Sequence, residues 1–322
     1  MDFRRDESTR TVRTPAKLNL YLDVLSRRDD NYHELETLMV PVAIWDSLFL
    51  AAIPPSDGGL GEIILDVRQA SPVRPPPGQV DGLLNSDVPQ GKDNLVVRAL
   101  ELLRERSGCR AGARLTLVKR IPVAAGLGGG SSDAAAALQL GNRVWRLGWS
   151  TQRLAELGAE LGSDVPFFTY RRSALCRGRG ERVTPLGPIR RFHAIIVKPP
   201  FGLRTPEVFG AHDARGSMAA VGGARLIRSE RLSSAISALR RGDWAALGQS
   251  LTNRLEAAAA SMAPWIEQVR AVFARLTFVG HQLSGSGSAY FGICSHAAHA
   301  QRLAATLRTR QLGRVYAVSS CT

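Results

Sequence analysis

Pro122-Val-Ala-Ala-Gly-Leu-Gly-Gly-Gly-Ser131-Ser132-Asp133 is the stretch that says most about the fold of this 322-residue chain. Four of its five residues from 126 to 130 are glycine, so the backbone can adopt conformations closed to other residues and approach a ligand closely. The two serines and the aspartate are typical helix-start residues, and the alanines that follow favour a helix. A helix that begins here presents amide donors and the positive end of its dipole, which predicts an anion site, most often for phosphate.

Two familiar nucleotide-binding patterns do not fit this loop. Gly126-x-Gly128 begins a dinucleotide fingerprint, but Ser131 stands at its third glycine position. No Lys-Ser or Lys-Thr pair follows the glycines, so the Walker pattern fails as well. The loop alone therefore leaves two alternatives, a phosphate site of another design and a plain turn before a helix.

Composition points to a soluble cytoplasmic protein. The first residues, Met1-Asp-Phe-Arg-Arg, show no apolar signal segment, and no apolar run reaches membrane-spanning length. Four widely spaced cysteines are expected to be reduced thiols, since they form no Cys-x-x-Cys pair. The net charge of +14 comes mostly from scattered arginines without interleaved aromatic residues, so neither a nucleic acid nor a membrane is an expected partner.

Apolar periodicity predicts a mixture of strands and helices. We expect strands at 11–24, 37–52, 63–67, 114–121, 173–184, 192–198, 278–283, 289–294 and 314–319. We expect helices at 94–106, 133–147, 151–161, 230–260, 264–276 and 296–310. Strict βαβ alternation is missing, which favours the α+β class. The length suggests two domains, 1–165 and 166–322. The Pro/Gly-rich segment 71–91 is an expected loop to which no role is assigned.

Three separated motifs carry a resemblance to a known family. The first motif is Pro15-Ala16-Lys17-Leu18-Asn19-Leu20, which is followed by Asp30-Asn31-Tyr32-His33. The second is the glycine loop, which is followed by Gly162-Ser163-Asp164-Val165-Pro166. The third, near the end of the chain, is Leu283-Ser284-Gly285-Ser286-Gly287. In this order the chain resembles the GHMP small-molecule kinases, which include galactokinase, homoserine kinase and mevalonate kinase. Asn31 stands where the family usually has glycine. Asparagine is the best substitute at a positive φ, so we expect the turn to be retained.

The resemblance implies a two-domain α+β kinase with its active site in the cleft between an ATP-binding domain, 1–165, and a C-terminal domain, 166–322. It implies that the triphosphate lies in the glycine loop. The ATP-binding residues are then Pro122, Val123, Ala124, Ala125, Gly126, Leu127, Gly128, Gly129, Gly130, Ser131 and Ser132.

Catalytic roles also follow from the resemblance. Asp164 corresponds to the general base that faces the acceptor hydroxyl, and Lys17 to the ammonium beside it and the transferred phosphate. Taken alone, Asp164 is more typical of a turn or cap, and Lys17 of a solvated strand edge. Mg²⁺ is implied by the charge of the transferred group. Its ligands are not assigned: Asp133 is either a water-mediated ligand or an N-terminal cap.

The resemblance also implies which residues bind the substrate that accepts the phosphate. Tyr32 and His33 are expected to bind a cytosine ring, with Phe209 stacked on its other face. Asn19 is expected to form a hydrogen bond with the polyol. The predicted activity is ATP-dependent phosphorylation of a cytidine-diphosphate-linked polyol in isoprenoid precursor synthesis. The alternatives are another GHMP kinase, such as homoserine kinase, and a nucleotide-binding protein without catalysis. A homodimer is left open.

Overall fold

The computed structural model describes residues 9–55, 59–70, 88–216 and 222–321, so most of the predicted loop at 71–91 lies outside the described residues. The chain forms two compact units built from interleaved segments. Unit 1 takes residues from 1–16, 44–123 and 128–171, and unit 2 from 17–43, 124–127 and 172–322. The expected single division after residue 165 is therefore close to the end of unit 1, while two short segments before it pack with unit 2. Division into 1–165 and 166–322 stays a prediction.

Two long strands, β1 (Arg10–Arg27) and β2 (His33–Ile53), contribute residues to both units. The elements wholly in unit 1 are β3 (Ile63–Gln69), a 3₁₀ turn (Gly91–Asp93), α1 (Leu95–Ser107), β4 (Gly112–Lys119), α2 (Gly129–Val144), α3 (Thr151–Leu161) and α4 (Val165–Tyr170). Those wholly in unit 2 are β5 (Ala174–Gly178), β6 (Arg182–Pro185), β7 (His193–Lys198), α5 (Thr205–Ala214), α6 (Gly222–Arg241), α7 (Trp244–Ser250), β8 (Thr252–Asn253), α8 (Glu256–Met262), α9 (Trp265–Ala274), β9 (Gly280–Leu283), β10 (Tyr290–Cys294), α10 (Ala297–Thr309) and β11 (Arg314–Ser319).

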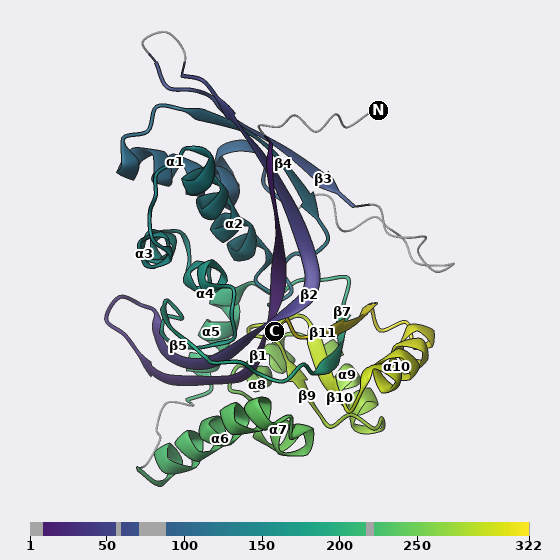
Figure 1. Ribbon diagram of the computed structural model, residues 1–322. Helices are drawn as coiled ribbons and strands as arrows, with labels where there is room; N and C mark the ends of the chain where they lie inside the picture. The colour runs from purple at the N-terminus through teal and green to yellow at the C-terminus, as the bar shows by residue number, and fades with distance from the viewer. Residues whose placement is uncertain (1–8, 56–58, 71–87, 217–221, 322) are drawn as a thin grey trace. The chain divides into compact units, whose positions relative to one another are not determined.

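Unit 1 packs helices against strands of a seven-stranded sheet. β4 pairs antiparallel with the end of β2 and parallel with β3, and its Leu115 and Leu117 are buried. Helices α1–α4 lie together beside these strands (Figure 1). Gly141 lets α2 approach α1, since a Cβ at this position would lie 2.6 Å from a methyl of Leu100. Close packing of this kind holds α2, and with it the end of the glycine loop, against the unit 1 core.

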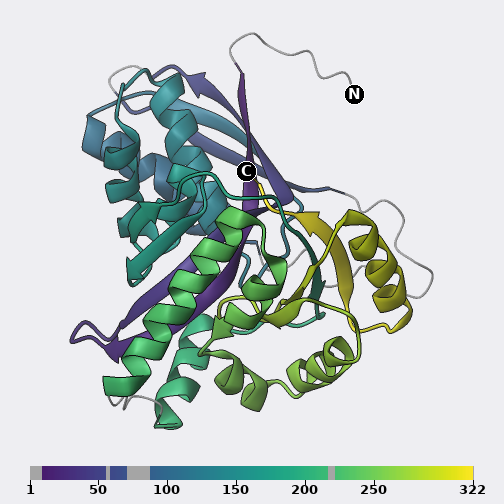
Figure 2. The same cartoon turned by 60° about the horizontal axis from the view of Figure 1, so that its bottom comes forward.

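Unit 2 contains a four-stranded antiparallel sheet in the order β11-β7-β10-β9. Its core joins Ile195 and Val197 of β7 to Tyr290 of β10 and Phe273 of α9. Helix α10, drawn in yellow, lies beside β11 in both views (Figures 1 and 2). The first half of β2, which belongs to unit 2, pairs with β5, and β8 pairs in parallel with Tyr21 and Leu22 of β1. The glycine-rich turn after β9 is thereby placed at the end of a buried strand.

The turn between β1 and β2 confirms the expectation for Asn31, whose φ is 64°. Its N–H donates to the Arg28 carbonyl at 3.2 Å, and its side-chain oxygen accepts from Arg27 at 3.1 Å. The left-handed conformation is thus retained by the residue type that tolerates it best after glycine.

Several predicted elements are confirmed and others are wrong. The strand expected at 173–184 is instead the two strands β5 and β6. The helix expected at 151–161 and the strand expected at 314–319 have those bounds. The single helix expected at 230–260 is instead α6, α7, β8 and the start of α8. It breaks because Gly242 adopts a φ of 77° and Asp243 caps α7 through the Ala246 N–H at 3.0 Å. The mixed elements confirm the α+β class. Among the described residues, no helix combines the length and the apolar character needed to cross a membrane.

Candidate functional site

Lys17 and Asn19 lie side by side on β1 and are buried, with 4% and 2% of their surfaces exposed. The Lys17 ammonium donates to the Asn19 side-chain oxygen, whose amide donates to Thr37 Oγ1 at 2.8 Å. A Cβ on Gly285 would lie 3.1 Å from Asn19 Oδ1 and 3.3 Å from Lys17 Nζ. The structure therefore brings together two predicted site residues and the second glycine loop, Ser284–Ser288, within unit 2.

Residues 124–127 of the first glycine loop are also part of unit 2. Three successive carbonyls there accept hydrogen bonds: Ala125 from Ala289 N at 3.0 Å, Gly126 from Ser284 Oγ at 3.2 Å, and Leu127 from Lys17 N at 3.0 Å. Gly126 has a φ of 72°, and a Cβ there would lie 2.0 Å from the Ser284 carbonyl oxygen. Glycine is required at this position by both conformation and space.

The remaining part of the loop begins α2 in unit 1. The helix starts at Gly129, four residues before the predicted start at 133, with Gly128 as its N-cap at a φ of 72°. No side chain caps the helix, so the amides of Gly129, Gly130 and Ser131 gain no side-chain acceptor there. Gly130 is exposed and Ser131 is partly exposed. These amides and the positive end of a 16-residue helix fit a phosphate group.

Ser132 is turned away from this helix end. Its hydroxyl is buried and donates to the Pro15 carbonyl at 2.6 Å, and its own carbonyl accepts from Thr14 Oγ1 at 2.9 Å. Ser132 therefore fastens the first turn of α2 to the start of β1. A hydroxyl contact to a phosphate is left to Ser131.

Asp133 is part of a buried charge cluster beneath the first turn of α2. The Lys119 ammonium donates to Asp133 Oδ2 at 2.6 Å and also to Asp46. Asp46 Oδ1 accepts from the Ile121 N–H at 2.9 Å and from the Arg120 N–H. The N-cap alternative for Asp133 is wrong, because Gly128 is the cap and Asp133 lies inside the helix. Its partner is an ammonium group instead.

The cluster holds two carboxylates and one ammonium, so one negative charge is in excess. Burial raises the pKa of Asp133 to about 8, although the Lys119 charge opposes that rise. The two carboxylates hold the pKa of Lys119 above its ordinary value against the effect of burial. Asp133 is therefore a carboxyl that retains a proton at neutral pH. Its buried Oδ1 has no hydrogen-bond acceptor or donor partner.

This protonation predicts a pH effect on stability. Because the folded pKa of Asp133 lies above the unfolded value, its contribution is fully present below about pH 4 and is lost as the pH rises through 8. Asp133→Asn imitates the protonated form at every pH. We expect urea unfolding between pH 5 and pH 8.5 to show wild-type stability falling relative to this variant. Parallel stability profiles would contradict the assignment of the proton.

Asp164 lies at the N-cap position of α4, and its side chain makes no capping hydrogen bond. The residue is partly exposed. The sequence left two non-catalytic roles open for Asp164, a turn residue and a helix cap, and the capping role is therefore excluded. Asp164 belongs to unit 1, whereas Lys17 belongs to unit 2.

The residues predicted to hold a base lie at the β1–β2 turn and on α5. The His33 ring stacks on Phe209, with centroids 4.7 Å apart, and His33 Nε2 is 2.7 Å from Asp213 Oδ1. This spacing leaves no room for a base between these two rings. Tyr32 is half exposed, and the Arg179 guanidinium lies over its ring at 4.6 Å. The sandwich of a cytosine between Tyr32 and Phe209 stays a prediction.

Sequence reasoning missed Asp46, Lys119 and Asp213. A signal for the first two was available, since each is a charged residue that directly follows a mostly apolar run, 38–45 before Asp46 and 115–118 before Lys119. Charged residues at such positions are rarely buried unless they are paired. Asp213 gives no comparable signal, because α5 was not predicted and its spacing from Phe209, one helical turn, became visible only in the structure.

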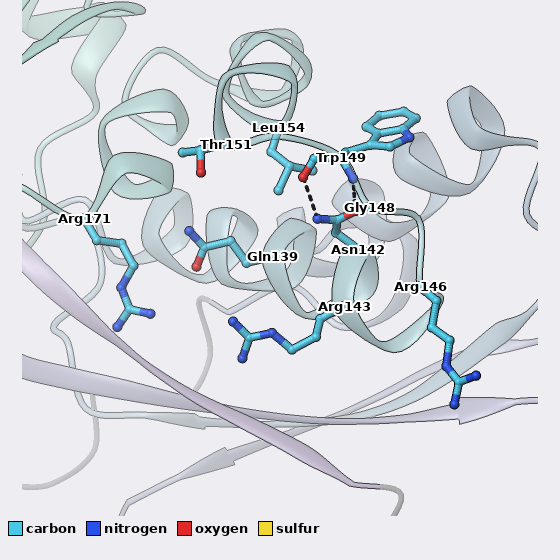
Figure 3. Close-up of a pocket in the computed structure, with 9 residues that line it drawn as sticks. All are labelled: Gln139, Asn142, Arg143, Arg146, Gly148, Trp149, Thr151, Leu154 and Arg171. Carbon is cyan, nitrogen blue, oxygen red and sulfur yellow. Dashed lines mark hydrogen bonds between the residues drawn. The ribbon is translucent and has the colours of Figure 1, made fainter.

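A hollow of about 500 Å³ lies elsewhere in unit 1, between the end of α2 and the start of α3. It is lined by three exposed arginines, Arg143, Arg146 and Arg171, and by Asn142, which bonds the Trp149 backbone twice (Figure 3). In this view Arg146 points away from the other two arginines. None of the predicted site residues lines the hollow.

Comparison with known proteins shows which family the chain matches. Residues 94–172 match the model of the GHMP kinases N terminal domain, and residues 235–312 match the GHMP kinases C terminal model. A 4-diphosphocytidyl-2-C-methyl-D-erythritol kinase from Pelotomaculum thermopropionicum is 39% identical over 92% of this chain and 93% of its own length. The enzyme of that name from Exiguobacterium sibiricum is 36% identical over 92% of this chain and 93% of its own.

Solved structures show the same relationship. A 4-(cytidine 5'-diphospho)-2C-methyl-D-erythritol kinase covers 97% of this chain, and the chain covers all of it, with a TM-score of 0.72 and 32% identity. A homoserine kinase from Cytophaga hutchinsonii has a TM-score of 0.71 over 100% of this chain and 97% of its own, at 18% identity, and so shares the fold. The chain therefore belongs to the GHMP kinases and, among them, to the family of 4-diphosphocytidyl-2-C-methyl-D-erythritol kinases.

Proposed function

We propose that this chain transfers the γ-phosphate of ATP to a hydroxyl of 4-diphosphocytidyl-2-C-methyl-D-erythritol, in the non-mevalonate route to isoprenoid precursors. The observation that carries the kinase chemistry is the start of α2, where a glycine N-cap leaves the first amides without a side-chain acceptor. The choice of acceptor is supported by relatives that are 34–39% identical and carry that name.

The first glycine loop, residues 122–132, holds the triphosphate in this proposal. The amides of Gly129, Gly130 and Ser131 donate to phosphate oxygens, and the Ser131 hydroxyl adds a further donor. The carbonyls of residues 125–127 already accept hydrogen bonds from within unit 2. Their positions are therefore fixed before the nucleotide binds, which lowers the entropy cost of ordering the loop.

In the transfer step, the acceptor oxygen bonds to the γ-phosphorus while the bond from that phosphorus to the β–γ bridging oxygen breaks. Asp164 takes the proton of the acceptor hydroxyl, so the attacking oxygen does not acquire a positive charge. The Lys17 ammonium offsets charge on the transferred group. The Lys17 side chain is restrained by Asn19, which keeps the ammonium in one place.

Mg²⁺ is part of the proposal because the moving phosphate carries charge that the protein must balance. Among the described residues, no group of three or more His, Cys, Asp or Glu side chains is arranged to hold a metal ion. Magnesium keeps several waters and binds substrate phosphates with few protein ligands. Ser131 is the partly exposed hydroxyl at the helix end that can contribute.

At the acceptor end, we propose that Tyr32, His33 and Phe209 recognise the cytosine and that Asn19 bonds the polyol. Asp213 holds His33 through a 2.7 Å contact to Nε2, which orients the ring. The cysteines within the described residues are not joined in disulfides, and we place the reaction in the reducing cytoplasm. The proposed partner is the small-molecule substrate, bound by a single copy or a homodimer.

A substrate panel tests this function. ADP release is measured with the cytidyl substrate, homoserine, mevalonate and galactose as acceptors. We expect kcat/KM for the cytidyl substrate to exceed that for the others by at least about 10²-fold, because buried polar groups built for one ligand reject another. Comparable turnover of homoserine would support the other GHMP kinase. ATP binding without ADP release from any acceptor would support the alternative without catalysis.

A further inference from the structure

The second glycine loop, Ser284–Ser288, is held at its entrance by two side chains from one short segment. The Asn253 amide donates to the Leu283 carbonyl at 2.9 Å and to the Gly285 carbonyl at 2.8 Å. Its side-chain oxygen accepts from the Leu255 N–H at 3.0 Å. Both ends of this amide are therefore occupied, and its orientation is fixed.

Glu256 completes the attachment. Its Oε2 accepts from the Leu283 N–H at 2.8 Å, so both backbone polar groups of Leu283 are bonded to side chains of the same segment. The other carboxylate oxygen lies 3.5 Å from the Tyr290 hydroxyl, which in turn is 2.9 Å from His281 Nδ1. Burial raises the pKa of Glu256, while the Leu283 N–H and the nearby Arg270 oppose that rise.

The same loop touches the catalytic lysine. Gly285 has a φ of 58°, and a Cβ there would lie within 3.3 Å of Lys17 Nζ and 3.1 Å of Asn19 Oδ1. The loop also donates from Ser284 Oγ to the Gly126 carbonyl at 3.2 Å. A shift of the loop therefore changes its spacing to Lys17, Asn19 and the first glycine loop.

We propose that Asn253 and Glu256 are positioning residues for phosphoryl transfer, which act through the second glycine loop on Lys17. This rests on the proposed function, in which Lys17 stabilises the transferred phosphate. Neither side chain contacts a reacting group. Their effect is to fix the distance from the loop backbone to the ammonium, and a misplacement of about 1 Å can lower a rate about 10²-fold.

The test compares Asn253→Ala with Ser250→Ala. Ser250 is also buried in unit 2, and its hydroxyl donates to the Ala246 carbonyl at 2.7 Å, away from the loop. We expect Asn253→Ala to lower kcat by about 10–10²-fold with KM for ATP and acceptor changed less than about threefold. Ser250→Ala keeps the wild-type kcat. Amide hydrogen exchange at residues 283–289 should accelerate only in Asn253→Ala.

Glu256 gives a second pair of variants if Asn253→Ala fails to fold. Glu256→Gln retains an oxygen that accepts from Leu283 N and should keep most of the wild-type kcat, whereas Glu256→Ala should not. A wild-type kcat in Glu256→Ala or Asn253→Ala, or unchanged exchange at the loop, overturns the proposal. If the wild type itself releases no ADP with the cytidyl substrate, the proposed function fails. Amide hydrogen exchange at residues 283–289 then still shows whether Asn253 and Glu256 hold the loop in place.

Discussion

Asp164→Asn is expected to lower kcat by about 10²–10⁴-fold, the usual contribution of a general base. The amide matches the carboxylate in shape, so the loss reports the proton acceptor rather than packing. Because the side chain makes no capping hydrogen bond to α4, the substitution removes no such bond from the helix start.

Steady-state ADP release with the cytidyl substrate measures this effect. KM for ATP should change little, because the triphosphate is assigned to the first glycine loop. Asp66→Asn serves as the control, since Asp66 is an exposed acid of unit 1 paired with Arg68 on β3. Turnover within threefold of the wild type in Asp164→Asn would remove Asp164 from the mechanism.

Lys119→Met is expected to reduce the free energy of unfolding by about 3–5 kcal/mol. The substitution removes the ammonium between Asp46 and Asp133 and leaves two buried carboxyl groups without their cation. Desolvated charges that lose a partner are among the largest single sources of instability. Urea denaturation at pH 7 measures the change.

An exposed ion pair provides the matched comparison. Arg68 and Asp66 approach to 2.6 Å, as close as Lys119 and Asp133, but both side chains are half exposed. Arg68→Ala should therefore cost at most about 1 kcal/mol. Adding Asp133→Asn to Lys119→Met should recover little of the loss, because Asp133 already retains a proton at pH 7. Equal losses in Arg68→Ala and Lys119→Met would show that burial of the cluster is unimportant.

Local signals were sufficient for elements whose ends are set by neighbouring residues. The helix at 151–161 has a cap that sequence can reveal, since Ser150 accepts from the Arg153 N–H at 3.2 Å. The region 230–260 was different: its alanine and leucine content favours a helix, although Gly242 and Asp243 are local signals of the break between α6 and α7. Thr252 and Asn253 leave the helix to pair with Tyr21 and Leu22, more than 200 residues earlier, and no local pattern reports such a pairing.

The candidate site shows the same division. Motif residues such as Lys17, Asn19 and Asp164 could be selected by residue type and order. The surroundings of Ser132 and Asp133 could not be predicted in this way, because their hydrogen-bond and ion-pair partners come from β1, β2 and β4. A serine and an aspartate at a helix start have the same local appearance whether they face a ligand or the core. Only tertiary packing distinguishes the two.

The order in which the chain is made has a consequence for the first glycine loop. Unit 1 is complete once residue 171 has been synthesised, whereas unit 2 needs residues from both ends of the chain. Gly126 accepts its hydrogen bond from Ser284, 158 residues later. At a translation rate of about 5–20 residues per second, the ribosome exposes the first glycine loop roughly 8–32 s before this partner emerges. A nascent chain therefore cannot complete the hydrogen bonds of residues 124–127 until synthesis is almost finished.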